Sequence, residues 1–389
     1  MTALAAILIG APIAMFAYAY LVYPAVLRIA ANGRPRLTPP DTPSEWPAIT
    51  VVIAAHNAER TIGRTLEHLL AADYPAERRQ IIVASDASTD ATCAVVAGFA
   101  TRGVELRHFE ERGGKTAAEN RVGGDVRGDI VISTDASIVV PAPSIKRLVR
   151  HFSDPSVGVV SGWAVAPGAE SAAGANGDAG YFQYEMRVRE LEARLGGIIG
   201  AMGGLYAIRR ELFQVALPTY IARDFASTLV ARERGFRSVI DRNATCLVGR
   251  GRSMIAEYDR KARTMLNGLD TLRHFAHLLD PMREGWFAFM LLSHKLCRWL
   301  VYLLAPLALL GLVLLADGRW PARIALVAIV AGLLVALVGL WWQPTNRRLG
   351  IPLSLGAYAV ISATAGVAGW RRFFLGRHAT TWTPTRREG

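Results

Sequence analysis

The chain has 389 residues, of which 52% are hydrophobic and 20% are charged, and its mean hydropathy of +0.25 is high for a wholly soluble protein. Its length also exceeds that of one ordinary domain, so we do not expect a single soluble domain. The net charge of +12 fits either nucleic acid or an anionic surface. Because no zinc-finger spacing or RNP-like motif accompanies it, we expect membrane lipids as partners and no nucleic acid.

Residues 1–28 are predicted to form a transmembrane anchor, because they contain the ~20 apolar residues that cross a bilayer. No basic residue precedes this run, whereas three arginines follow it: Arg28, Arg34 and Arg36. The positive-inside rule therefore places residues 30–296 in the cytoplasm. A signal peptide is the alternative, but the run lacks a basic start. Three scattered cysteines without metal or CxxC spacing fit a cytoplasmic domain.

Residues 29–47 are rich in proline, as is typical of a linker, and a domain over residues 48–250 follows. Its first half alternates apolar runs, which predict buried strands, with amphipathic stretches, which predict helices. The predicted strands are "AITVVIAA" from Ala48, "QIIVAS" from Gln80, "VELRHF" from Val104 and "DIVIST" from Asp129. The predicted helices between them are Arg60–Leu70, "TDATCAVVAGFA" and "TAAENRVGG". This alternation predicts an α/β fold with a mostly parallel sheet.

Polar side chains follow three of these strands. The three turns are "HNAE" from His56, "DASTD" from Asp86 and "DAS" from Asp135. In a parallel α/β sheet, ligands bind at the carboxyl ends of the strands. Any one of these turns alone would be read as helix capping or a solvated loop. Three at the same edge indicate a binding site.

At these positions the sequence resembles the family-2 inverting glycosyltransferases with a GT-A (Rossmann-like) fold. The resemblance is strongest to the membrane-anchored bacterial type related to cellulose, chitin-oligomer and hyaluronan synthases. It rests on "VVIAAHNAERTI", "IIVASDASTDAT", "RGGKTAAENR", "VISTDAS", "GAMGGLYAIRRELF" and "YIARDFASTLVARERGFRSV", taken in this order. The fold class implied is a GT-A catalytic domain flanked by transmembrane helices.

The resemblance implies a nucleotide-sugar site, with a UDP-hexose or UDP-N-acetylhexosamine as the expected donor. The residues that it places there are Ala54, Asn57, Glu59, Asp86, Lys115 and Asp135. Turn capping is the competing interpretation of Asn57 and Asp86, and a solvated surface that of Glu59 and Lys115. Sugar transfer requires an oriented nucleotide and stabilisation of the charge on the leaving diphosphate, and these residue types meet both needs.

Asp135 is expected to be catalytic and to approach a divalent cation, Mg²⁺ or Mn²⁺, on the donor diphosphate. The second aspartate of the DxD motif is replaced by Ser137, a weaker metal ligand. Asp224 is the candidate general base that deprotonates the acceptor. The family commonly has two successive acids at this place, but Arg223 replaces the first and is expected to lower the pKa of Asp224. A surface Arg–Asp pair is the competing interpretation.

Residues 251–297 are predicted to form amphipathic helices at the membrane interface. They include a basic stretch near the place where processive relatives carry a QxxRW motif, which is not reproduced here. The resemblance assigns five residues to the diphosphate or the acceptor: Gly203, Gly204, Arg260, Lys261 and Arg263. The three basic ones could equally face acidic lipids.

Residues 298–371 are predicted to contain two or three transmembrane segments. Residues 351–369 are diluted by glycine, serine and threonine, so they could span the bilayer or re-enter it. Residues 372–389 form a basic tail with "WTPTRRE", which resembles a tail of membrane relatives and has no evident chemical role.

We therefore expect a multi-pass enzyme of the cell (inner) membrane with a cytoplasmic catalytic domain. The expected reaction is sugar transfer, with inversion, to a lipid-linked or growing saccharide. The alternative is a membrane scaffold that binds nucleotide without catalysis, which the residues at positions 137 and 223 suggest.

Overall fold

The computed structural model describes residues 2–35, 40, 43–165, 177–248, 254–342 and 351–382. The chain divides into two compact units. One comprises Met1–Ala30, Gly251–Leu269 and Leu279–His378, and the other comprises Ala31–Arg250, Asp270–Leu278 and Ala379–Gly389. The predicted border between residues 250 and 251, residues 36–39 and 41–42 of the predicted linker and residues 383–389 of the tail lie outside the described residues.

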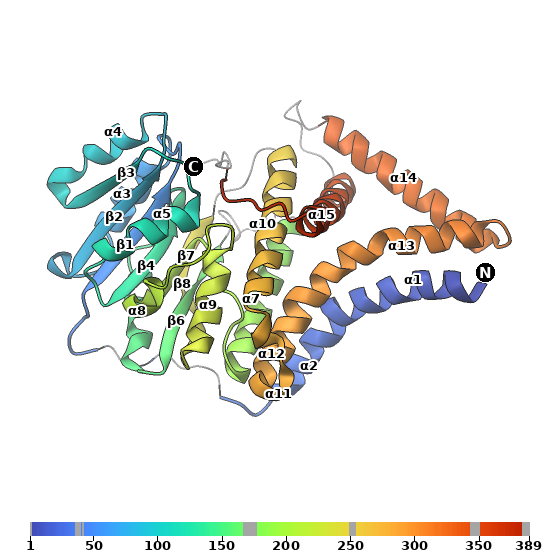
Figure 1. Cartoon of the computed structure of the whole chain (residues 1–389), viewed down its shortest axis with the longest axis horizontal. Helices are drawn as coiled ribbons and strands as arrows, with labels where there is room; N and C mark the ends of the chain where they lie inside the picture. Colours follow the sequence, from blue (N-terminus) through green and yellow to red (C-terminus); the bar gives the residue numbers. More distant parts are fainter. Residues whose placement is uncertain are drawn as a thin grey trace. The chain divides into compact units, whose positions relative to one another are not determined.

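The second unit is built on an eight-stranded mixed sheet (Figure 1). Its strands are β1 Ile49–Ala55, β2 Arg79–Asp86, β3 Val104–Phe109, β4 Ile130–Asp135, β5 Ile138–Val139, β6 Val157–Val165, β7 Leu205–Arg209 and β8 Arg237–Val248. The strand order is β3-β2-β1-β4-β7-β6-β8-β5. The four predicted strands correspond to β1–β4 and are parallel to one another. The prediction of a mostly parallel sheet holds for this half, whereas β7 pairs antiparallel with both β4 and β6.

Short helices cover the sheet because their apolar faces match its buried strands. They are α3 Ile62–Leu70, α4 Thr92–Ala97, α5 Lys115–Arg121, α6 Ser144–Val149, α7 Gly177–Leu195, α8 Arg210–Phe213 and α9 Arg223–Glu233. All seven residues of β1 are buried. Leu66 and Leu69 of α3 join Val51 and Ile53 of β1 in one apolar core. Each such side chain stabilises the fold by about 1.5–3 kcal/mol, so this core fixes the end of β1 from which the first polar turn departs.

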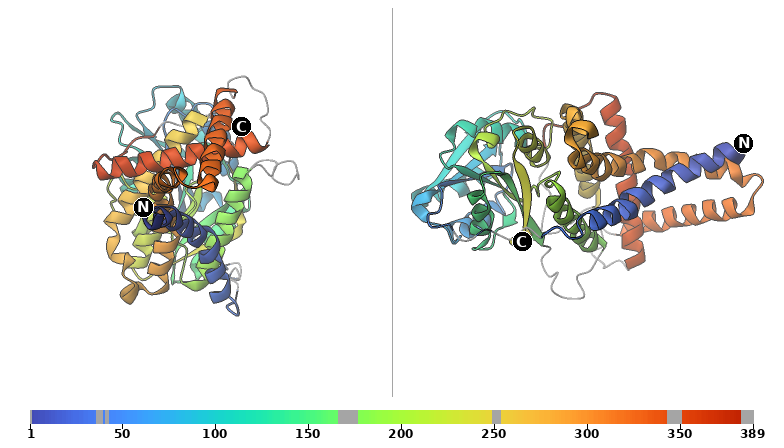
Figure 2. Two further views of the ribbon diagram at one scale, coloured as in Figure 1. Left: turned by 90° about the vertical axis from the view of Figure 1, so that its right-hand side faces the viewer. Right: turned by 90° about the horizontal axis from the view of Figure 1, so that it is seen from below.

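The first unit is helical. Its helices are α1 Thr2–Ala17, α2 Tyr23–Ala30, α10 Met254–His274, α11 Pro281–Glu284, α12 Trp286–Leu291, α13 Arg298–Ala316, α14 Trp320–Trp342 and α15 Ile351–Phe374, with π-helical turns at Tyr18–Val22 and Leu292–Cys297. The end of α10, from Asp270, belongs to the second unit. Helix α1 lies alongside α13 in both Figure 1 and Figure 2. The contact is close at Gly311, where an added Cβ would lie 2.9 Å from the carbonyl oxygen of Ala5. Small residues allow such close helix contacts in membranes.

Two helices in the described part of the chain are long and apolar enough to cross a membrane, Thr2–Ala30 and Trp286–Ala316. A shorter apolar helix covers Trp320–Val335. The second candidate span begins inside the stretch that was predicted to lie at the interface. Residues 351–369, for which a re-entrant path was considered, belong to the uninterrupted helix α15.

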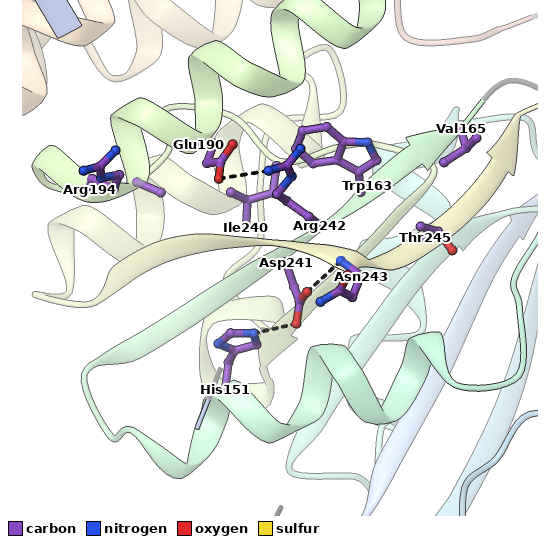
Figure 3. A pocket seen from close by; sticks show the side chains of 11 residues that line it. His151, Trp163, Val165, Glu190, Arg194, Ile240, Asp241, Arg242, Asn243 and Thr245 are labelled. Carbon is purple, nitrogen blue, oxygen red and sulfur yellow. Dashed lines mark hydrogen bonds and ion pairs between the residues drawn. The ribbon is translucent and has the colours of Figure 1, made fainter. Parts of the chain in front are cut away.

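A cavity of about 570 Å³ lies in the second unit beside α7, β6 and β8 (Figure 3). Asp241, a buried residue that lines this cavity, accepts hydrogen bonds of 2.8 Å from His151 Nε2, from Arg150 Nη2 and from the backbone N–H of Asn243. Burial acts to raise the pKa of Asp241, but these three donors outweigh it and lower the pKa to about 2. Asp241 therefore ties β8 to the end of α6.

We expect Asp241→Asn to lower the free energy of unfolding by roughly 2 kcal/mol at pH 7, because the depressed pKa is a stability contribution. That contribution is fully present above pH ~4 and is lost as the pH falls towards about 2. Denaturant unfolding in detergent at pH 7 and pH 3 measures it. Asp154→Asn is the control, since the exposed Asp154–Arg237 pair should contribute at most about 1 kcal/mol. Equal losses for the two variants would contradict this account.

Candidate active site

Parallel pairing brings the predicted turns together at one edge of the sheet. Ala54 of β1 is in register with both Ala84 of β2 and Asp135 of β4. Asp135 is the last residue of β4, and its side chain is 34% exposed. Its carboxylate can therefore reach a ligand bound over the carboxyl ends of these strands.

Lys115 lies directly beside Asp135. It is the first residue of α5, and its Nζ donates to Asp135 Oδ1 at 2.6 Å and to the carbonyl oxygen of Gly203 at 3.1 Å. Burial acts to lower the pKa of Lys115, but the carboxylates of Asp135 and Glu119 outweigh it and raise the pKa above its ordinary value. Lys115 is thus a fixed positive charge at the edge of the sheet.

Asp224 also lies next to Gly203. It lies in the first turn of α9, and a Cβ added at Gly203 would be only 2.6 Å from Asp224 Oδ2. The backbone oxygen of Asp224 also accepts from the N–H of Ala201 at 3.2 Å. Lys115 and Asp224 therefore contact one glycine, with Asp135 held by the lysine. The neighbouring Gly204 accepts a 2.8 Å hydrogen bond from Thr134 of β4, which anchors this segment to the sheet.

Asp86 holds the loop from which Lys115 projects. The residue is fully buried, and its two carboxylate oxygens accept from the N–H groups of Gly113 and Gly114, each at 2.8 Å. Gly114 has φ +92°, a conformation that favours glycine. Asp86 thus positions the start of α5, and a further contact between Asp86 and a nucleobase stays a prediction.

Asn57 and Glu59 join the turn after β1 to the turn after β2. Asn57 Oδ1 accepts from Thr89 N–H at 2.8 Å, and Glu59 Oε2 accepts from Ala91 N–H at 3.0 Å. Asn57 has φ +47°, and Ala87 in the facing turn has φ +52°. Such backbone conformations are uncommon outside glycine and often occur at functional sites. The two side chains stabilise the turns, and their binding to a nucleoside stays a prediction.

The C-terminal segment reaches this edge as well, which the sequence reasoning missed. Arg112 donates to the carbonyl oxygen of Trp382, 270 residues away in the chain. The Trp382 ring packs against His56, with 6.0 Å between ring centroids, and a Cβ on Gly114 would overlap the carbonyl oxygen of Thr380. The tryptophan of the "WTPTRRE" tail was the available signal, but no local pattern indicates its partner.

A divalent cation fits Asp135. The carboxylate is partly exposed, and Ser137, two residues further on, is half-buried and offers a second oxygen. The described residues contain no cluster of three or more His, Cys, Asp or Glu side chains that could hold a metal. Mg²⁺ or Mn²⁺ bound here would take its remaining ligands from phosphate and water, as is common for Mg²⁺ at nucleotides.

Arg223 is not part of a surface ion pair with Asp224. It is 3% exposed, and its guanidinium contacts Glu119 and Asn120 of α5 and the carbonyl oxygen of Phe213. The competing interpretation of a solvated pair at a helix start is therefore wrong, because burial directs the arginine into the domain.

The predicted cations of residues 251–297 lie in the helical unit. Arg260 Nε donates to Glu257 Oε2 at 2.9 Å, and Lys261 Nζ lies 3.7 Å from Glu257 Oε1. Both therefore have an acidic partner on their own helix, α10. A role for Arg260, Lys261 or Arg263 at a diphosphate stays a prediction.

Part of the chain is similar in sequence to known proteins. Residues 50–216 match the family model of Glycosyl transferase family 2. The beta-monoglucosyldiacylglycerol synthase of Synechocystis is 31% identical over 166 residues, which cover 39% of this chain and 34% of the relative. The poly-beta-1,6-N-acetyl-D-glucosamine synthase of Staphylococcus aureus is 28% identical over 148 residues, or 37% of this chain and 34% of the relative. The match thus spans about a third of each of these relatives.

A solved structure has the same fold over nearly the whole chain. The mannosyltransferase PcManGT from Pyrobaculum calidifontis, solved in complex with GDP-Man and Mn²⁺, superposes with a TM-score of 0.74 at 22% identity. The alignment covers 95% of this chain and 100% of that one. This likeness confirms the predicted GT-A fold.

Gly203→Ala tests the geometry of the site. The added Cβ would displace the Asp224 carboxylate, so we expect sugar transfer to fall by about 100-fold or more while the protein stays folded. Initial rates and thermal unfolding of the same preparations measure both effects. Gly124→Ala is the matched control, because its Cβ would meet nothing within 4 Å. Wild-type rates in Gly203→Ala would show that Asp224 is not required in this position.

Proposed function

We propose that the chain is a glycosyltransferase, because residues 50–216 match the family model of Glycosyl transferase family 2 and the fold is GT-A. The protein transfers a hexose or an N-acetylhexosamine from a UDP-sugar to a lipid-linked or growing saccharide, with inversion at C1. The observation that carries the proposal is that Lys115 bonds both Asp135 and the carbonyl oxygen of Gly203, and that the Asp224 carboxylate lies next to the same glycine. The relatives named as a beta-monoglucosyldiacylglycerol synthase and a poly-beta-1,6-N-acetyl-D-glucosamine synthase support an acceptor that is a lipid or a polysaccharide.

Asp224 acts as the general base. Its carboxylate takes the proton of the acceptor hydroxyl as that oxygen attacks C1 of the donor sugar. The new C1–O bond forms on the face opposite the diphosphate, and the electron pair of the broken bond leaves with the nucleoside diphosphate. General-base catalysis of this kind contributes about 10²–10⁴-fold in rate. Asp224 and Lys115 both lie next to Gly203, which brings the base close to the donor-side cation.

Lys115 and Asp135 serve the donor side. The Lys115 ammonium is held in place by Asp135 Oδ1 and Gly203 O, and it offers its charge to the developing negative charge of the diphosphate. A divalent cation bound to Asp135 and Ser137 would supply further positive charge there. Asp86 keeps Lys115 in position through the Gly113–Gly114 turn.

Membrane attachment fits this reaction. The helices Thr2–Ala30 and Trp286–Ala316 are apolar enough to cross a bilayer, and an acceptor on a lipid would be presented at its surface. We propose a multi-pass protein of the cell membrane with a cytoplasmic catalytic domain, on the basis of the arginines that follow the first span.

Replacement of the two carboxylates tests the assignment. Asp224→Asn and Asp135→Ala are each expected to lower sugar transfer by about 10²-fold or more, since one removes the base and the other the partner of Lys115. UDP release from a panel of UDP-sugars, with added Mg²⁺ or Mn²⁺, measures turnover. The panel includes GDP-mannose, because the structure with the same fold was solved with that donor.

Asp129→Asn is the control variant. Asp129 precedes β4 at its amino end and forms an exposed pair with Arg210, so its loss should leave turnover unchanged. Wild-type turnover in Asp224→Asn would contradict the assignment. Nucleotide binding without turnover by the wild-type protein, with every donor and metal, would instead support the scaffold.

A further inference from the structure

A buried polar contact connects α5 to α9. Arg223, the first residue of α9, is 3% exposed, and Glu119 of α5 is fully buried. Arg223 Nε lies 3.5 Å from Glu119 Oε2. The same guanidinium donates through Nη1 to the carbonyl oxygen of Phe213 at 2.9 Å and through Nη2 to Asn120 Oδ1. Its position is therefore fixed from three directions.

Glu119 and Arg223 depend on each other. Glu119 Oε1 accepts from Ser133 Oγ at 2.8 Å, whereas Glu119 Oε2 and Arg223 Nε form no hydrogen bond within the described residues. An unpaired buried charge is costly, and removing one partner of a buried pair is strongly destabilising. The pair thus holds α5 and α9 together without filling every hydrogen-bonding position.

Uncharged hydrogen bonds strengthen the same contact. Thr116 Oγ1 donates to the carbonyl oxygen of Ile221 at 2.9 Å, and Asn120 Nδ2 donates to that of Leu217 at 2.7 Å. Both acceptors lie in the segment that leads into α9. The N-cap residue of α9, Ala222, provides no side-chain cap, and its backbone N–H donates to Thr271 Oγ1 at 3.0 Å, so the start of this helix is held by bonds from α5, from Arg223 and from Thr271.

This arrangement matters because each helix carries one side of the candidate site. Helix α5 begins with Lys115, one helical turn before Glu119, and Asp224 directly follows Arg223. Ser133, which donates to Glu119, lies on β4 two residues before Asp135. A shift of α9 relative to α5 would therefore change the distance between the Asp224 carboxylate and the Lys115–Asp135 pair.

We propose that Glu119 and Arg223 are positioning residues for sugar transfer, whose buried ion pair sets the distance between the general base and the donor-binding pair. This inference rests on the proposed function of Asp224. It gives Arg223 a structural role at the site: its contacts with Glu119, Asn120 and the carbonyl oxygen of Phe213 fix the backbone from which Asp224 projects.

If the Glu119–Arg223 pair served only to stabilise the fold, replacing it would have a different effect on catalysis. Apolar residues of similar volume often replace a buried ion pair without loss of stability. If the pair served only stability, the double variant Glu119→Leu/Arg223→Met would keep both its fold and its activity. If the pair positions Asp224, the variant keeps its fold but loses the bonds to Phe213 O and Asn120, and catalysis suffers.

The experiment compares kcat and the donor KM of this double variant with those of the wild type, together with thermal unfolding. We expect wild-type stability, a donor KM within about twofold and a kcat lowered at least about tenfold, because small misplacement of a catalytic group is costly. A folded double variant with wild-type kcat would overturn the inference.

Arg223→Lys decides the question if the double variant does not fold, because it keeps the buried charge and loses the planar fork of donors. Lowered kcat at unchanged donor KM supports positioning, and wild-type kcat overturns it. Arg209→Lys is the matched control. Like Arg223, Arg209 donates to backbone carbonyl oxygens, those of Phe152, Asp154 and Val157, and it packs on two phenylalanine rings. It lies opposite the first residue of β4, at the other end of that strand from Asp135. It should change stability alone.

Asp224→Asn is measured in parallel, so that the two failures can be told apart. If Asp224→Asn turns over like the wild type, the proposed base is wrong. If Asp224→Asn is inactive while the folded double variant or Arg223→Lys keeps wild-type kcat, the base stands and only the positioning inference fails.

Discussion

The carboxylate of Asp86 lies fully buried at the end of β2 and accepts hydrogen bonds from two consecutive glycine N–H groups. A buried charge is tolerated only when it is paired or hydrogen-bonded, so the Gly113–Gly114 turn must fold against it. Helix α5 starts at the next residue, and Lys115 therefore projects towards Asp135. From this one contact follow the position of the fixed cation and, through Glu119 and Arg223, the start of α9.

Close backbone contact at Gly203 brings the two sides of the reaction together. The glycine carbonyl accepts from Lys115, and the Asp224 carboxylate occupies the space that a side chain would need. In the proposed reaction, Asp224 as base and Lys115 as donor-side cation then lie close to one sugar carbon. The cavity beside α7 involves a separate set of contacts centred on Asp241, which stabilise the domain.

Sequence alone predicted β1 to β4 within one residue at each end, because their apolar runs are buried and their polar turns mark where they end. The strands after Asp135 had no such signal: β5 has two residues, and β8 pairs with β6 across register shifts. The polar residues after β1 and β2 were found by their positions. Their partners, such as Thr89 N–H for Asn57, depend on how two distant turns meet.

The contacts of Arg223 and Trp382 show the same limit of local patterns. Next to an aspartate, an arginine suggests an exposed pair, yet burial turns Arg223 towards Glu119, 104 residues before it. Trp382 meets His56 only because the C-terminal segment returns to the catalytic domain. Neither contact has a sequence spacing that could reveal it, whereas Asp135 and Lys115 were identified through motifs that fold locally.

The most direct test of the central claim is a structure of Asp224→Asn in complex with a UDP-sugar and Mn²⁺. We expect the diphosphate to lie beside Lys115 and Asp135, with C1 of the sugar between Asp135 and residue 224. A nucleotide bound elsewhere, such as in the cavity lined by Trp163 and Arg242, would contradict it.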